Sequence, residues 1–149
     1  MKLSTKLFKY DFNPDTGIST VTLKSKRGLF TGTAKVHPED KEAQSKFFGL
    51  HTAENKALRK LYKEELKREK IILETIKRVQ KDLQENLHDT GSYDNYLILS
   101  TLRKRLYFME RNHSNNITIL KDSLEEFKKS LAKDKEYLKK IKEKKRSKE

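Results

Sequence analysis

The chain has 149 residues, a length typical of a single domain, and 34% of them are hydrophobic while 38% are charged. This composition excludes a large globular core but suits an elongated pair of helices with one buried stripe on each. The chain has no cysteine, and no segment approaches the roughly 18 apolar residues of a membrane span, so disulfides, thiolate metal ligands and a spanning helix are excluded. We expect a cytoplasmic protein without a membrane partner and without a cofactor.

The net charge of +13 is concentrated at the two ends of the chain. Residues 1–36 hold 7 basic and 2 acidic side chains (+5), residues 37–90 hold 12 and 11 (+1), and residues 91–149 hold 16 and 9 (+7). A basic surface favours contact with nucleic acid, an anionic membrane or an acidic protein, and it equally serves solubility.

Residues 1–36 have the pattern of a three-stranded antiparallel meander. Two turn signals, Asn13–Gly17 and Lys26–Gly28, separate three short segments rich in β-branched and aromatic residues. In the first segment, Phe8, Tyr10 and Phe12 alternate onto one face of the strand. The strands are expected over Leu3–Phe12, Ile18–Lys24 and Leu29–Val36.

Residues 37–149 have a helical pattern that begins at His37–Asp40, where Pro38 suits the first helical position and the acids suit the first turn. Gly49 predicts either an early helix end or a close packing contact. A polar, glycine-containing break reverses the chain, so we expect helices over about 38–88 and 94–144 with a turn at 88–95. Two apolar stripes with steps of mostly three or four support this: Leu58, Leu61, Tyr62, Leu66, Ile72, Ile76, Val79, Leu83 and Leu87, then Leu99, Leu102, Leu106, Met109, Ile117, Leu120, Leu124, Phe127, Leu131, Leu138 and Ile141.

Such stripes give each helix one apolar seam and require a partner helix. Three strands alone are marginally stable, so the helices should cover the apolar face of the sheet. The predicted fold is therefore α+β. It consists of an N-terminal three-stranded antiparallel β-meander (1–36) docked on the base of a long, coiled-coil-like antiparallel helical hairpin (37–149), in one structural domain.

Both stripes lose their apolar residue at a polar layer formed by Glu65, Glu69 and His113. Positions whose numbers sum to about 182 are equally far from the turn, which puts His113 near Glu69 and Ile117 near Glu65. We interpret this layer as a device that sets the helix register, so His113→Leu should preserve or raise thermal stability. The alternative is a functional recess. A metal site is disfavoured because the Glu-x-x-His repeat of carboxylate-bridged bundles is absent.

Catalytic motifs are missing from the sequence. The chain has no phosphate-binding glycine loop, no zincin helix and no nucleophile elbow, and its four histidines are scattered. The acidic residues lie among lysines at spacings typical of solvated helix faces. We therefore expect a protein that is not an enzyme.

The C-terminal tail, residues 139–148, holds seven basic residues and one acid. A solvated helix end accounts for this pattern, and a phosphate-contacting stripe is the functional alternative. In a hairpin, the tail and the sheet are both far from the turn, so we expect the basic side chains of the two to merge into one patch. The candidate nucleic-acid contacts are Lys24, Lys26, Arg27 and Lys35 in the sheet, and Lys139, Lys140, Lys142, Lys144, Lys145 and Arg146 in the tail.

The segment FTGTAKVHPED at residues 30–40, followed by Gly49 and Ala53-Glu54, resembles a pattern in small uncharacterised proteins of Gram-positive bacteriophages and prophages. In those proteins a short sheet ends in a Gly-x-Ala strand, and His-Pro with an acid opens a long helix rich in Lys and Glu. The resemblance covers residues 28–60. It implies a mobile-element origin, a host cytoplasm as the workplace, and an accessory factor that binds a host or phage protein.

The expected function is a protein-interaction module that binds its partner through the helical hairpin or the sheet. The first alternative is a nucleic-acid-binding accessory protein that uses the basic ends. The second is a structural coiled-coil oligomer, because surplus apolar residues lie beside or off the main stripes. These residues are Leu73, Ile98, Tyr107 and Ile119.

Overall fold

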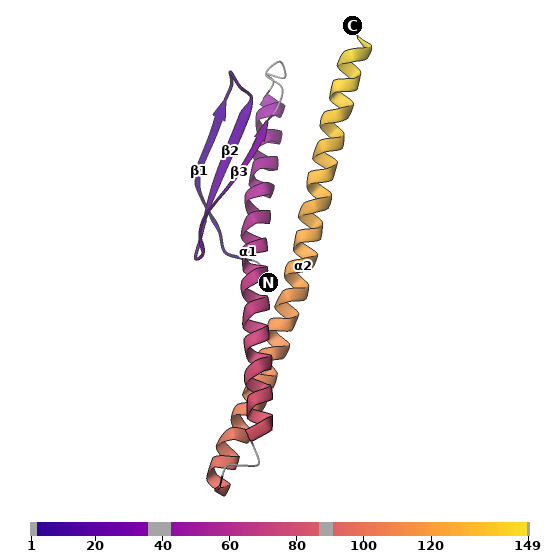
Figure 1. Ribbon diagram of the computed structural model, residues 1–149. Coiled ribbons are helices and arrows are strands. Elements are labelled where there is room, and N and C mark those ends of the chain that lie inside the picture. The colour runs from indigo at the N-terminus through magenta and orange to yellow at the C-terminus, as the bar shows by residue number, and fades with distance from the viewer. Residues whose placement is uncertain (1–2, 36–42, 87–90, 149) are drawn as a thin grey trace. The chain divides into compact units, whose positions relative to one another are not determined.

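Five elements make up the residues described by the computed structural model, which are 3–35, 43–86 and 91–148. The strands β1 (Lys6–Asn13), β2 (Ile18–Ser25) and β3 (Gly28–Lys35) precede two long helices, α1 (Ala43–Asn86) and α2 (Tyr93–Ser147). This is the predicted α+β arrangement (Figure 1). The chain forms two compact units, which we call the sheet unit (Lys2–Lys63 with Asp122–Glu149) and the turn unit (Glu64–Lys121).

Some predicted boundaries lie outside the described residues. They are the strand end at Val36, the helix start at His37–Asp40, Leu87, and the first part of the turn at 88–90. The start of α2 is described, one residue before the expected position, and its end is three residues beyond it. Ser92 caps this start, because its Oγ accepts a hydrogen bond from the backbone N–H of Asn95 at 3.2 Å.

The three strands form one antiparallel sheet in the order β1-β2-β3. Both connections need a glycine in a backbone region that other residues rarely adopt, with φ of 70° at Gly17 and 120° at Gly28. The first turn is further held by Asn13, whose side-chain Oδ1 accepts a hydrogen bond from the N–H of Asp15 at 2.9 Å. Local turn chemistry therefore sets the order of the strands.

A β-bulge in β1 interrupts the alternation of side chains at Phe8. The pairing of β1 with β2 is regular over residues 9–13 but shifts between Leu7 and Lys9. Leu7, rather than Phe8, therefore lies opposite Leu23, and paired residues point to the same face of a sheet. Phe8 is 59% exposed. The expected regular alternation of Phe8 with the aromatic residues after it is interrupted at this point, because one extra residue in a strand shifts the alternation.

One face of the sheet packs against the first half of α1 (Figure 1). The core of this contact is formed by Val21, Leu23 and Ala34 from the sheet and by Ala53 and Ala57 from the helix. Small residues on the helix allow the two backbones to come close, and Val21 and Leu23 of β2 are then only 3% exposed. The expected docking of the sheet on the helices takes place at this core.

At Gly32 the backbones of β3 and α1 come close together. A Cβ atom placed on Gly32 would lie 2.0 Å from the carbonyl oxygen of Ala53 and 2.6 Å from the backbone nitrogen of Ala57. Both of these atoms belong to the helix backbone and cannot rotate away. Only glycine fits this position without moving the helix.

Two lysines of α1 secure the outer edge of β3. The ammonium groups of Lys56 and Lys60 donate hydrogen bonds to the backbone carbonyls of Thr33 (3.0 Å) and Thr31 (2.7 Å). As the residue number rises in α1 it falls in β3, so the strand runs antiparallel to the helix. The same contacts satisfy carbonyl groups that an edge strand otherwise leaves without a protein partner.

Gly49 lies within α1, which continues through it without a break, and Gly49 is buried. Of the two predicted explanations for this glycine, the early helix end is therefore excluded, and its burial agrees with the packing contact.

The two helices pack antiparallel within each unit. In the sheet unit, the ring of Phe48 contacts Tyr137 and the ring of Tyr62 contacts Phe127, each with ring centroids 5.1 Å apart. In the turn unit, the seam is formed by buried apolar side chains that include Ile76 of α1. The predicted helical hairpin is the arrangement observed.

Candidate functional site

The predicted polar layer lies in the turn unit. The imidazole Nδ1–H of His113 donates a hydrogen bond to the carboxylate oxygen Oε2 of Glu69. Glu65 and Glu69 are both buried, and the side chain of His113 is 22% exposed. The structure thus pairs His113 with the residue that the sequence register assigned to it.

The burial of Glu69 changes the outcome expected for His113→Leu. Without the imidazole, a buried carboxylate loses the donor that compensates for its removal from water. We therefore now expect this single substitution to destabilise the protein, the opposite of the sequence-based expectation. Replacing both partners together avoids that cost.

Two further polar pairs cross the seam in the sheet unit, and sequence reasoning missed both. The hydroxyl of Thr52 donates to Oδ2 of Asp134 at 2.8 Å, and the side-chain amide of Asn55 donates to Oγ of Ser130 at 3.2 Å. Both Thr52 and Asn55 are buried. The sequence contained a signal for both pairs, because Thr52 and Asn55 continue the apolar stripe upstream of Leu58 at the same spacing of three residues.

The three pairs share one chemistry. Each joins α1 to α2 by a hydrogen bond between side chains, so a shift of one helix along the other would leave buried polar atoms without partners. Among the described residues, no group of three or more His, Asp or Glu side chains is placed to hold a metal ion.

The structure separates the basic residues of the sheet from those of the tail. Since β3 runs antiparallel to α1, the turn between β2 and β3 lies beside the middle of α1, next to Lys60. The tail follows Tyr137, which contacts Phe48 near the start of α1. At 1.5 Å per residue, these two levels of α1 are on the order of 20 Å apart. The predicted merged patch is therefore wrong for three of the sheet residues, Lys24, Lys26 and Arg27.

Lys35 lies at the other end of β3, toward the start of α1. The described basic side chains of the tail are exposed on the last turns of α2. They form a basic helix end by themselves. These residues are Lys139, Lys140, Lys142, Lys144 and Arg146.

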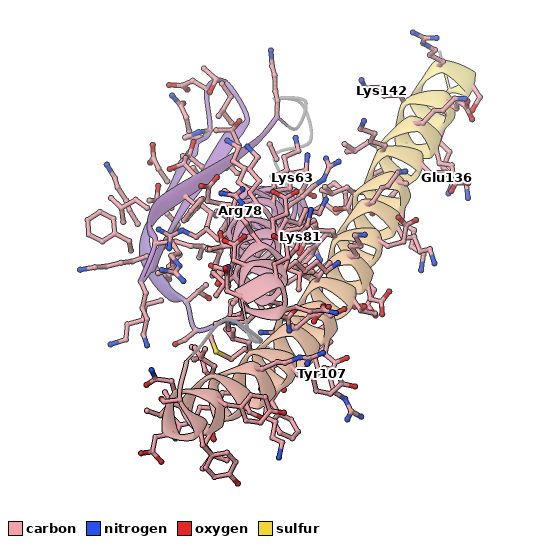
Figure 2. All side chains as sticks on the ribbon, turned by 60° about the horizontal axis from the view of Figure 1, so that its bottom comes forward. Lys63, Arg78, Lys81, Tyr107, Glu136 and Lys142 are labelled. Atoms are coloured by element: carbon pink, nitrogen blue, oxygen red, sulfur yellow. The ribbon has the colours of Figure 1, made fainter. Side chains whose placement is uncertain are left out.

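Exposed aromatic side chains gather on the first half of α2, in the turn unit. Tyr93, Tyr107 and Phe108 expose 74%, 60% and 61% of their surface. Tyr107 and Phe108 follow the buried seam residue Leu106, so each is turned away from α1 by 100° or more. Figure 2 shows Tyr107 on this part of α2, where side chains project from several sides of the helix.

These residues form two stripes along the outer side of α2. Tyr96 and Tyr107 are eleven residues apart, as are Leu97 and Phe108, and eleven residues make about three whole turns of an α-helix. Lys104 lies between the two pairs and is exposed. We call Tyr93, Tyr96, Leu97, Tyr107 and Phe108 the aromatic surface. Of these five residues, sequence reasoning had noted Tyr107 alone.

Comparison of the chain with protein-family models, with curated proteins and with solved structures finds no match. The resemblance of residues 28–60 to phage proteins therefore stays a prediction. None of the helices, as far as the structure describes them, combines the length and the apolar character needed to cross a membrane.

Proposed function

We propose that the protein is a non-enzymatic protein-interaction module, a phage-related accessory factor that binds a host or phage protein through its helical hairpin. The observation that carries this proposal is the aromatic surface of α2. Tyr93, Tyr107 and Phe108 are each at least 60% exposed on helix faces that α1 does not cover. The phage setting is supported by the resemblance of residues 28–60.

The chemistry of this surface favours a protein partner. Tyrosine and arginine are enriched among the residues that dominate binding energy at protein interfaces, and large aromatic rings bury much surface with little loss of side-chain freedom. Arg103, Lys104 and Arg111 are exposed on the same part of α2. A partner with an apolar surface bordered by acidic residues would complement both features.

The test is affinity capture from lysate of infected host cells, with and without nuclease. A Tyr107→Ala/Phe108→Ala protein should lose the captured partner, whereas Phe47→Ala, which removes an equally exposed ring from the sheet unit, should retain it. Retention of every captured protein by the double variant would refute the proposal. Capture that disappears with nuclease would replace it by the nucleic-acid alternative.

The alternative of a nucleic-acid-binding accessory protein is favoured by one observation, the exposed lysine and arginine side chains on the last turns of α2. Contacts of this kind neutralise phosphates without reading sequence, so binding would fall steeply with salt. The separation of Lys24, Lys26 and Arg27 from the tail removes three of the ten candidate residues from the merged basic surface that the sequence suggested. This weakens the alternative relative to the protein-binding proposal.

A further inference from the structure

The two rows of the seam in the turn unit are unequally covered. Seam residues alternate between two rows because their steps alternate between three and four. In one row, Ile76 and Leu106 are only 5% and 8% exposed. In the other row the exposed fractions rise to 37–44%. This second row consists of Ile72 and Val79 from α1 and Leu102 and Met109 from α2.

The exposed row is continuous across the two helices. The hydrogen bond between Glu69 and His113 sets the register of the turn unit. Ile72 lies three residues after Glu69 on α1, and Met109 lies four residues before His113 on α2. Ile72 is therefore level with Met109. Val79 is level with Leu102 by the same count. In an antiparallel pair, positions displaced in the same angular sense from the seam point to the same side, so the row forms one strip.

The strip is large for a surface that faces water. Ile98 flanks it on α2 and is 64% exposed, and Ile71, 63% exposed, lies on the same side of α1 beyond the bordering residues. Together the six apolar side chains present roughly 500 Å², near the upper end of the 300–600 Å² of the largest apolar patch on a typical monomer. With the polar residues beside them, the area approaches the ~800 Å² per partner that a stable complex buries.

We propose that a second copy of this chain covers this strip, so that two turn units form an antiparallel four-helix bundle. The two helices of one turn unit bury one row of the seam between them. The exposed row can be buried by the two helices of a second turn unit, as in a four-helix bundle. The proposal does not depend on the proposed function, because the aromatic surface lies on the outer side of α2, away from the strip.

On α1, the charges beside the strip match a second copy. On α1, Arg68, Thr75 and Asp82 follow one another at seven-residue intervals and border the exposed row. If the two α1 helices pack antiparallel about an axis at Thr75, Arg68 of each copy lies opposite Asp82 of the other. Within the described part of the chain, neither Arg68 nor Asp82 has an ion-pair partner of its own.

The alternative dimer, with both turns at the same end, lacks this match. It sets Arg68 against Asn112 and Asp82 against Ile98 of the other copy, and both charges stay unpaired. The two turns are therefore at opposite ends of the proposed bundle.

The chain offers a clean test, because it contains no cysteine. Thr75→Cys should form a disulfide between copies under mild oxidation, since the axis brings the two Cβ atoms together. The control Lys81→Cys lies on α1 about a third of a turn away from this side, is equally accessible, and should stay monomeric in the same conditions. Equal cross-linking of both variants, or of neither, would overturn the assigned interface.

Charge exchange provides a second, independent measurement by light scattering over a dilution series. Arg68→Asp replaces two attractions per dimer by two repulsions and should weaken the dimer about 10-fold. Combining it with Asp82→Arg should restore the dimer. Val79→Glu, on a side chain already 38% exposed, should give a monomer with unchanged helix content. A wild-type protein that stays monomeric at ~100 µM would refute the proposal, as would failure of the double variant to recover.

Discussion

Substitution of Gly32 by alanine tests the contact that joins the sheet to α1. The new Cβ would lie 2.0 Å from the carbonyl oxygen of Ala53, whereas carbon and oxygen atoms pack at about 3.3 Å or more. The helix backbone must therefore move away from β3 by more than 1 Å, as a rough difference of these distances. A gap of that size forfeits a quarter to a half of the dispersion energy of the atoms that line it.

The expected cost follows from overpacking a well-packed core, which is typically 1–3 kcal/mol. The clash at Gly32 involves backbone on both sides, so the cost should fall near the upper end. Alanine also restricts the unfolded chain and returns about 0.5–1 kcal/mol. The net loss of unfolding free energy should be about 2 kcal/mol.

Urea unfolding followed by circular dichroism measures this loss, and hydrogen exchange at the amides of Val21 and Leu23 shows whether the sheet has loosened. The control is Gly91→Ala, which makes the same chemical change in open space at a φ of 67°. It should cost about 1 kcal/mol through backbone strain alone and leave exchange in β2 unchanged. If Gly32→Ala unfolds within about 0.5 kcal/mol of the wild type and keeps its exchange protection, the close approach of β3 and α1 is not what holds the sheet.

The remaining predictions concern polar groups. The hydroxyl of Ser19 is buried without a hydrogen-bond partner among the described residues, so Ser19→Ala should raise the unfolding free energy by about 1 kcal/mol, and a loss of stability in urea unfolding would contradict this. His113→Leu should cost about 1–3 kcal/mol, whereas the double variant with Glu69→Leu should be as stable as the wild type or more so; thermal unfolding of both decides, and a stable single variant would show that Glu69 does not need His113. Deletion of residues 139–149 should abolish any salt-dependent binding to duplex DNA at ~50 mM salt, measured by fluorescence anisotropy, and undiminished binding would exclude the tail as the contact.

The two helices and the turns between the strands could largely be predicted from the sequence. Steps of three and four repeat over enough residues to identify both helices, and the turn glycines at 17 and 28 identify the hairpins. Even the pairing of Glu69 with His113 followed from counting outward from the turn. These features depend on the spacing of apolar residues and on the number of residues that separate a position from the turn. Both can be read from a single sequence.

The tertiary structure decided what depends on two elements meeting. The bulge at Phe8 interrupts the strand alternation, and no residue type marks such an insertion. Gly32 looked like an ordinary strand residue until the backbone of Ala53 was placed against it. The direction of β3 along α1, set by Lys56 and Lys60, separated basic residues that the linear order appeared to unite. Periodicity specifies which face of a helix is apolar, but how far that face is covered, as at Val79 and Leu102, follows only from the packing of its neighbours.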